Sequence, residues 1–305
     1  MTKLDLMVDS VGSFSRFQRK ALNRIVENSG EEFKHFAEDL IGRLEHVAAE
    51  HGKDITFVAE AYHNYTKEIK AEELYFAKNQ RYRESDFAEV YEKVYGQEAY
   101  MLHYVLALGM TQAFWANHYQ IVRFYLDEFL PRISAARSGA EVGVGHGLFH
   151  AEMLKAAMKM ESLMLDISPI SLSVCGAMIE ATGLDRNRAK PIICDIQKDV
   201  PIEDRSLDVL LLGEIVEHIE NGAKLLSTLA MRMCPNGLCF FTTAANAPAP
   251  DHILLFRSVS EIRTLIEENG WSIRAESIGT LGDMPVEDAE KNGQNINYAA
   301  ILDVK

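Results

Sequence analysis

Three glycines at alternate positions, Gly143, Gly145 and Gly147, follow the acidic residue Glu141 within residues 140–149. Glycine lacks a Cβ atom, so it accepts left-handed backbone conformations and lets a ligand approach the main chain closely. We therefore predict that a buried strand turns sharply into a helix here, with the turn beside a ligand. A glycine-rich turn alone is common, so its meaning depends on the segments that follow it.

The chain before residue 131 has the periodicity of amphipathic helices. Phe33, Phe36 and Leu40, for example, recur at helical spacing. Asp54 stands where a helix N-cap is expected. We predict five or six helices between about residues 10 and 130, with Pro131 closing the last.

After Pro131 short apolar segments alternate with amphipathic ones. The predicted strands are residues 140–144, 163–165, 191–194, 207–212, 238–243, 271–278 and 298–302. This alternation is typical of a mostly parallel sheet covered by helices on both faces. We therefore expect an all-α domain over residues 1–131 and an α/β domain over residues 132–305. Ligands bind such sheets beyond the carboxyl ends of the strands, where the glycine turn lies.

Charge and apolar patterning narrow the class of ligand. The formal net charge is −14, of which −4 falls on residues 1–138 and −10 on residues 139–305. A nucleic-acid-binding domain needs a cationic face, so this balance favours a small molecule over DNA or RNA. No apolar run reaches the roughly 18 residues of a membrane span. The N-terminus also lacks the pattern of an export signal.

The four cysteines show no paired spacing of a metal or disulfide site. We expect free thiols, no metal and a cytoplasmic location. The sequence leaves the oligomeric state open, a homodimer included.

Acidic residues close the predicted strands that follow the glycine turn. Asp166, with Ile167 after it, comes about 20 residues downstream, where a carboxylate can accept both hydroxyls of a ribose. Asp195 and Ile196 follow the third strand, and a carboxylate with an apolar neighbour suits the amino edge and face of an adenine. Glu214 follows the fourth strand.

In this order the segments resemble the Rossmann-like, class I S-adenosylmethionine-dependent methyltransferases. The first motif of that family reads acidic-x-Gly-x-Gly-x-Gly, and residues 213–219 (GEIVEHI) and 236–243 (NGLCFFTT) resemble its fourth- and fifth-strand segments. The resemblance covers about residues 138–305 and implies a seven-stranded sheet with an antiparallel last strand. A dinucleotide-binding dehydrogenase is the alternative, but its G-x-G-x-x-G spacing places a glycine where this chain has Leu148.

The resemblance implies S-adenosylmethionine as the cofactor. Glu141 and Glu214 would complement the positive charges of that cofactor. For Glu214 and Glu217 the alternative is ordinary complementation of a helix dipole. The residues then expected to bind the cofactor are Glu141, Gly143, Gly145, Gly147, Asp166, Ile167, Asp195, Ile196 and Glu214.

The helical half holds ten of the eleven tyrosines, all between positions 62 and 125. They could form an aromatic pocket that favours a sulfonium through cation–π contacts, or simply the core of a helical bundle. Trp115, Asn117, His118 and Tyr119 concentrate indole, amide, imidazole and phenol groups on one helix. We take Trp115, Asn117 and Tyr119 as substrate-binding candidates and His118 as a catalytic candidate.

A second candidate segment follows the fifth strand and contains Asn246, Asp251 and His252. We predict that Asn246 contacts substrate and that His252, oriented by Asp251, acts as a general base. Alternatively, Asp251 caps a helix that begins near Ile253.

Three functions remain open from the sequence. The first is methyl transfer from S-adenosylmethionine to oxygen or nitrogen of a small molecule, in the manner of the tailoring methyltransferases that the helical cap resembles. The second is intramolecular alkylation of the cofactor, which releases methylthioadenosine. The third is cofactor binding without catalysis.

Overall fold

The computed structural model describes residues 1–305, apart from the side chain of Asp283. The helices are α1 (Lys3–Phe14), α2 (Arg16–Asn28), α3 (Glu31–Glu50), α4 (Ile55–Asn79), α5 (Phe87–Val90), α6 (Glu98–Phe114), α7 (Ala116–Phe124), α8 (Leu148–Ala156), α9 (Pro169–Ala181), α10 (Gly222–Arg232), α11 (Val259–Glu268) and α12 (Val286–Lys291). The strands are β1 (Ser138–Val142), β2 (Glu161–Asp166), β3 (Ala189–Ile193), β4 (Leu207–Gly213), β5 (Met233–Ala245), β6 (Trp271–Thr280) and β7 (Ile296–Val304).

Side-chain caps explain where the N-terminal helices begin. The Thr2 hydroxyl accepts a hydrogen bond from the Asp5 backbone N–H, and the Asp5 carboxylate accepts one from the Thr2 N–H, so the first helix starts earlier than expected. The Asp54 carboxylate accepts hydrogen bonds from two backbone N–H groups at 3.0 and 3.1 Å, as predicted for an N-cap. Pro131 lies in the short turn Leu130–Arg132, where the helical run ends.

The seven strands form one sheet in the order β3-β2-β1-β4-β5-β7-β6. Strands β1 to β5 pair in parallel, whereas β7 runs antiparallel to both β5 and β6. This confirms the predicted sheet, each strand of which overlaps its predicted range. The strand order reverses between β1 and β4, and ligands bind parallel sheets at such a switch point.

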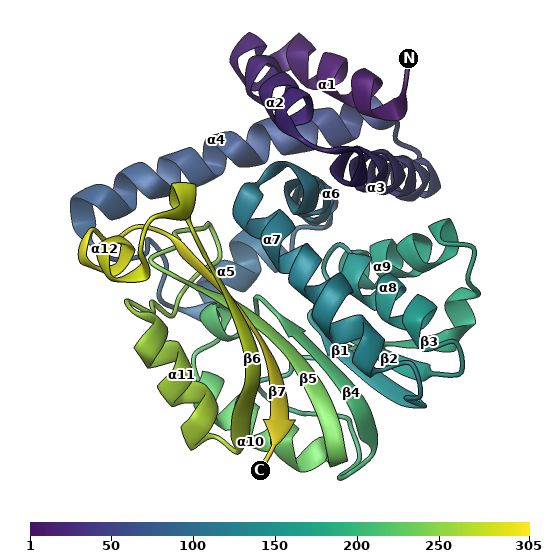
Figure 1. The fold of residues 1–305 in the computed structure, drawn as a ribbon, viewed down its shortest axis with the longest axis vertical. Helices are drawn as coiled ribbons and strands as arrows, with labels where there is room; N and C mark the ends of the chain where they lie inside the picture. Colours follow the sequence, from purple (N-terminus) through teal and green to yellow (C-terminus); the bar gives the residue numbers. More distant parts are fainter.

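Helices cover both faces of this sheet (Figure 1). Successive residues of a strand point to opposite faces. Accordingly, Phe240 of β5 packs into the core shared with α8, α9 and the N-terminal helices, and Phe241 packs into the core shared with α10 and α11.

The apolar core is continuous across the expected domain boundary at residue 131. Tyr125 and Phe129, from the π-helical turn after α7, contact the Phe240 ring with centroid distances of 4.7 and 5.3 Å. The Tyr125 hydroxyl also donates a hydrogen bond to the backbone carbonyl of Phe149, at 2.7 Å. The segment after α7, at the end of the helical half, therefore packs directly on the sheet. This packing fixes the position of helices α1 to α6 relative to the edge of the sheet.

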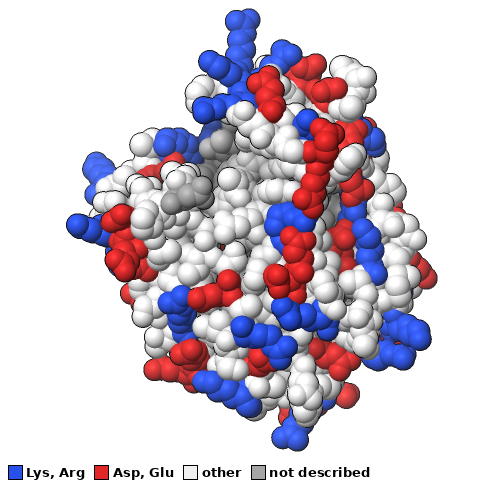
Figure 2. All heavy atoms as spheres, in the orientation of Figure 1, with Lys and Arg blue, Asp and Glu red and all other residues white. Residues whose placement is uncertain are grey.

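Charges are mixed on the face of the molecule shown in Figure 2, where basic and acidic side chains alternate without a broad area of either sign. Among the described residues, no helix combines the length and the apolar character that crossing a membrane requires.

Candidate active site

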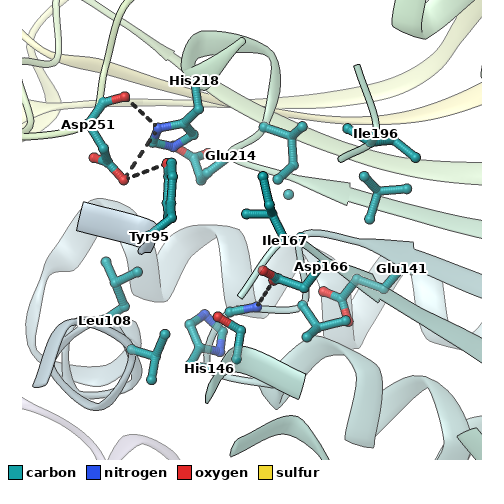
Figure 3. Close-up of a pocket in the computed structure, with 18 of the residues that line it drawn as sticks. Tyr95, Leu108, Glu141, His146, Asp166, Ile167, Ile196, Glu214, His218 and Asp251 are labelled. Carbon is teal, nitrogen blue, oxygen red and sulfur yellow. Dashed lines mark hydrogen bonds and ion pairs between the residues drawn. The ribbon is translucent and has the colours of Figure 1, made fainter. Parts of the chain in front are cut away.

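A cavity lies at the carboxyl edge of β1, β2 and β4, between the sheet and the N-terminal helices (Figure 3). Its walls come from three parts of the chain. The sheet side contributes Glu141, Gly143, Gly145, Asp166, Ile167, Asp195, Ile196 and Glu214; the N-terminal helices contribute Phe87, Tyr95, Tyr104, Leu108, Gln112 and His118; and the loops after β4 and β5 contribute His218, Asp251 and His252.

The three glycines of the turn have positive φ angles of 71°, 46° and 73°, but they serve different purposes. A Cβ atom on Gly145 would meet no protein atom within 4 Å, so this backbone is open toward the cavity. A Cβ atom on Gly147 would lie 2.6 Å from the Cα atom of Cys175 in α9. Gly147 does not line the cavity, and its missing side chain instead lets α8 pack closely on α9.

Glu141 is buried near the end of β1 and pairs with His150 of α8. Nδ1 of His150 lies 3.1 Å from the Glu141 carboxylate, and Nε2 lies 2.8 Å from the Ser162 hydroxyl. Burial raises the pKa of Glu141 and lowers the pKa of His150 to about 3. Both shifts favour an uncharged pair, and this pair fixes the orientation of the Glu141 side chain at the cavity wall.

Asp166 lies at the end of β2, beside the glycine turn. Its carboxylate accepts hydrogen bonds from the backbone N–H groups of Ser168, at 2.8 Å, and Gly145, at 3.4 Å. Burial raises the pKa of Asp166 to about 6, although these hydrogen bonds act in the opposite direction. Asp166 and the turn therefore form one cradle from two adjacent parallel strands.

Asp195 and Ile196 follow β3 at the far end of the same wall. The Asp195 carboxylate accepts a hydrogen bond from the Gln197 backbone N–H at 3.1 Å and pairs with Lys198 at 2.9 Å. Ile167 and Ile196 add an apolar surface between these acidic positions. The arrangement offers polar and apolar contacts side by side, as a nucleoside requires.

Asp251 has partners that the sequence did not indicate. Its carboxylate accepts hydrogen bonds from the hydroxyls of Tyr95, at 3.0 Å, and Tyr104, at 2.6 Å, and lies 3.4 Å from Nδ1 of His218. Burial acts to raise the pKa of Asp251, but His218, His252 and the two hydroxyls outweigh it, and the pKa is lowered. Asp251 is thus a buried carboxylate held between the loop after β4 and the N-terminal helices.

Two of these partners, His218 and Tyr104, stand in recognisable sequence contexts. His218 belongs to the GEIVEHI segment at the carboxyl end of β4, the edge where ligands bind. Tyr104 is one residue of an i,i+4 tyrosine pair with Tyr100, whose ring stacks on it at 6.0 Å. The spacing identified the pair, but not which hydroxyl faces the cavity.

The predicted catalytic histidines both line the cavity. His252 is buried, its Nδ1 atom has no hydrogen-bond partner, and burial lowers its pKa to about 3. Nδ1 of His118 lies 2.9 Å from the Thr111 hydroxyl, and burial lowers the pKa of His118 to about 4. Both imidazoles are therefore neutral near pH 7.

The four residues predicted to bind substrate do not line the cavity. Trp115 stacks on Tyr65 at 5.9 Å. The Asn117 amide donates a hydrogen bond to the Asn297 side chain. Tyr119 packs against two phenylalanines of α3, and the Asn246 amide donates to the Arg257 carbonyl at 3.1 Å. These side chains support the architecture around the cavity.

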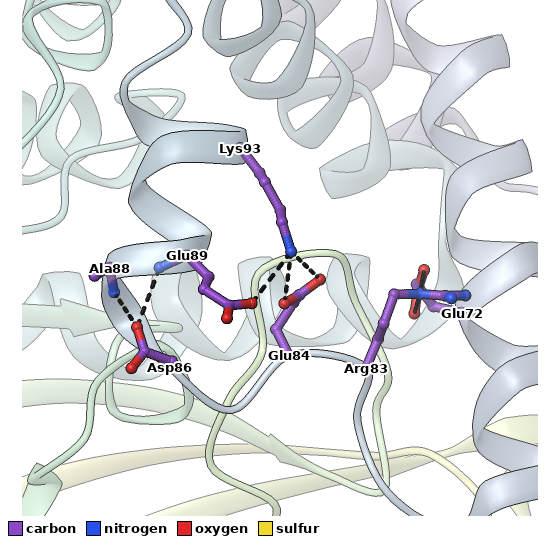
Figure 4. Close-up of polar contacts among 7 residues, drawn as sticks. All are labelled: Glu72, Arg83, Glu84, Asp86, Ala88, Glu89 and Lys93. Atoms are coloured by element: carbon purple, nitrogen blue, oxygen red, sulfur yellow. Dashed lines mark hydrogen bonds and ion pairs between the residues drawn. The ribbon is translucent and has the colours of Figure 1, made fainter.

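A segment between α4 and α6, residues 80–97, crosses the cavity and supplies Phe87 and Tyr95 to its wall. The Arg83–Glu72 ion pair, at 2.9 Å, ties the segment to α4, and the Lys93–Glu84 ion pair, also at 2.9 Å, joins two parts of the segment itself (Figure 4). The segment is therefore anchored near its start to α4 and near its end, through the Tyr95 hydroxyl, to Asp251 in the loop after β5.

Comparison with known proteins agrees with this geometry. Residues 140–241 match the model of a methyltransferase domain family. A search of curated protein sequences gives no match.

Two solved structures are similar in fold. The mitomycin 7-O-methyltransferase MmcR has 13% sequence identity and a TM-score of 0.53, over 86% of this chain and 74% of that chain. The phosphoethanolamine N-methyltransferase 2 of Haemonchus contortus, in complex with S-adenosyl-L-methionine, has 14% identity and a TM-score of 0.51, over 73% and 60% of the two chains. The sheet order, the glycine cradle and the family match together show that this chain carries a class I, Rossmann-like methyltransferase domain whose cofactor is S-adenosylmethionine.

Proposed function

We propose that this protein transfers a methyl group from S-adenosylmethionine to an oxygen or nitrogen atom of a small molecule. Residues 132–305 would bind the cofactor, and residues 1–131 would cap the substrate. The observation that carries the proposal is one cavity that extends from Gly145 and Asp166 to Asp251 and His252. Donor and acceptor would therefore share an enclosed space, as group transfer requires.

The residues of the sheet edge suit the cofactor chemically. Asp166 offers a carboxylate to ribose hydroxyls, and Gly145 leaves room for close approach to the backbone. Glu214 places a carboxyl group on the wall of a cavity in which no lysine or arginine lines the described surface, whereas Glu141, uncharged in its pair with His150, offers only hydrogen bonds there. Bound S-adenosylmethionine supplies an electrophilic methyl group on a positively charged sulfur, which such a wall would stabilise.

The wall opposite the glycine turn would orient the acceptor and help to remove its proton. Tyr95 and Tyr104 hold Asp251 in place, and His252 presents an imidazole without a hydrogen-bond partner. The role of His252 as a general base, and that of His118, stay predictions.

Calorimetry with S-adenosylmethionine and S-adenosylhomocysteine tests cofactor binding first. Mass spectrometry of small molecules that copurify with the protein would then identify acceptor candidates, and transfer of a radiolabelled methyl group to them would be measured. We expect His252→Ala to lose transfer while keeping cofactor binding, and His35→Ala, on the exposed surface of α3, to keep both. Absence of cofactor binding would contradict the proposal.

Incubation with cofactor alone separates the other functions. Methylthioadenosine formed without an acceptor would favour intramolecular alkylation. Tight cofactor binding with no transfer in any fraction would favour a non-catalytic protein.

A further inference from the structure

Four side chains with metal-ligand chemistry meet at the end of β4, beside the cavity. Glu214 directly follows β4, and Glu217 and His218 lie in the turn Val216–His218 after it. His252 lies in the loop after β5. Ligand atoms of Glu217, His218 and His252 all lie within 4.8 Å of one another, and the carboxyl group of Glu214 contacts that of Glu217. We call these four residues the Glu217 cluster.

Three members of the Glu217 cluster have a buried polar atom without a hydrogen-bond partner. These atoms are Oε1 of Glu214, Oε1 of Glu217 and Nδ1 of His252. Glu217 is fully buried and His252 is 7% exposed. Burying such groups unpaired destabilises the folded protein unless a ligand satisfies them. Carboxylate oxygens, and the nitrogen of a neutral imidazole that carries no hydrogen, offer lone pairs, so with the His252 hydrogen on Nε2 these atoms suit a cation.

The remaining atoms of the Glu217 cluster are held by neighbours that orient the ligands. The Thr243 hydroxyl donates a hydrogen bond to Oε2 of Glu217 at 2.8 Å, which leaves Oε1 free. Nδ1 of His218 lies 3.0 Å from the backbone carbonyl of Asp251, which can only accept. Nδ1 therefore carries the hydrogen, and the Nε2 lone pair of His218 is free. Histidine ligands of metals are commonly fixed in this way.

The local charge also favours a bound cation. Glu214, Glu217 and Asp251 bring three carboxyl groups together, and no lysine or arginine is among the described residues that line the cavity. The His218 and His252 rings cross at 83° with centroids 4.7 Å apart, and a ring nitrogen of each lies within 4.8 Å of the other.

We propose that Glu217, His218 and His252, with Glu214 beside them, bind a divalent cation of the Mn²⁺, Fe²⁺, Co²⁺ and Zn²⁺ class. Mixed imidazole and carboxylate donors suit these ions. In this arrangement His252 is a metal ligand and not a free general base. The alternative that satisfies only the carboxyl groups is a proton shared between Glu214 and Glu217, and it leaves Nδ1 of His252 unpaired.

The catalytic role of the cation rests on the proposed function. It makes that function more specific, because a bound cation favours a hydroxyl group as the methyl acceptor. A cation lowers the pKa of a hydroxyl that binds to it. The hydroxyl proton passes to solvent and its oxygen takes the methyl group. The electron pair of the broken carbon–sulfur bond stays on sulfur. An amine would not need this activation.

Calorimetry with Mn²⁺ alone, on chelator-treated full-length protein, tests the site without any acceptor. We expect one ion per chain for the wild type and a rise in Tm with Mn²⁺. Glu217→Gln and His252→Asn should each weaken binding by at least about tenfold. Co²⁺ should give a visible absorption band that His252→Asn changes.

The chain offers two matched controls. His46, Glu50 and Glu180 form an exposed cluster, and Glu141, His150 and Cys175 form a buried one. His46→Gln, in the exposed cluster, should leave Mn²⁺ affinity unchanged. Thr243→Val keeps all four ligands and should weaken affinity less than Glu217→Gln, which guards against a variant that merely unfolds.

Three results would overturn the inference: no Mn²⁺ or Co²⁺ binding at millimolar concentration, binding that Glu217→Gln and His252→Asn leave intact, or binding that only His46→Gln removes. Cofactor affinity, measured separately by calorimetry, tells failure of the metal site from failure of the proposed function. Transfer that is fully active after metal removal would instead support His252 as a free base.

Discussion

The two walls of the cavity are built by different means. The sheet wall uses backbone and short-range neighbours: Gly145 donates its N–H to Asp166, and both lie at the ends of adjacent parallel strands. The opposite wall joins distant segments, because Tyr95 and Tyr104 reach Asp251 across more than 140 residues of sequence. The sheet wall is thus a local motif for a cofactor that many proteins of this fold share. The structure of the opposite wall depends instead on how the helices pack.

The strongest test of this contrast is Gly145→Val. Gly145 has a φ of 46° and opens onto the cavity, so a branched side chain would occupy the space of the cofactor. We expect no cofactor binding in calorimetry. Gly183→Val is the matched control, because Gly183 also has a positive φ with open space around it but lies outside the cavity. Equal loss in both variants would attribute the effect to backbone strain.

Asp166→Ala should have the next largest effect. Loss of charge-assisted hydrogen bonds to the ribose should weaken cofactor binding by about 1–3 kcal/mol. Calorimetry with S-adenosylhomocysteine measures it, since the ribose is the same in both ligands. An unchanged dissociation constant would refute the ribose assignment.

The pH dependence of cofactor binding sharpens the same assignment. Burial raises the pKa of Asp166 to about 6, so the carboxylate is ionised at pH 7.5 and protonated at pH 5. A protonated carboxyl group accepts fewer hydrogen bonds, so affinity should be constant above pH 7. As the pH falls through 6 it should decrease, by up to about tenfold per pH unit. Asp166→Asn should flatten the profile, and a wild-type profile that is already flat would contradict this account.

On the opposite wall, Tyr104→Phe should have the smallest effect on cofactor binding. The substitution removes the hydroxyl that donates a hydrogen bond to Asp251 at 2.6 Å. A hydrogen bond to a charged group contributes about 1.5–3 kcal/mol, and we expect its loss to slow methyl transfer. Tyr100→Phe is the matched control, because its hydroxyl donates to Glu68 outside the cavity. If both variants transfer the methyl group equally well, transfer does not depend on the hydrogen bond from Tyr104 to Asp251.

The parts of the fold that the sequence predicted are those set by local patterns. A buried strand has an apolar run of residues whichever element it packs against. Asp54 caps its helix by accepting hydrogen bonds from backbone N–H groups only two and three residues later. The first helix begins earlier than predicted because Thr2 and Asp5 cap each other, which is also a local signal.

The substrate side could not be predicted in the same way. Asn117 and Tyr119 share α7 with His118, and Trp115 directly precedes that helix, yet of these four only His118 reaches the cavity. Composition placed aromatic and polar groups near the site, but the rotation of each helix selects which of them face it. His150 was likewise invisible as a partner of Glu141, because the turn that brings them together belongs to the folded cradle.

The sequence by itself determined the sheet, its glycine turn and the acidic strand ends, because strand period, glycine spacing and parallel connections act over short separations. Only the tertiary structure decided that Asp251 pairs with His218 and two tyrosines, that Gly147 serves packing, and that Glu217 joins His252. Those contacts arise where segments far apart in the chain meet, and their geometry follows from how the helices pack against the sheet.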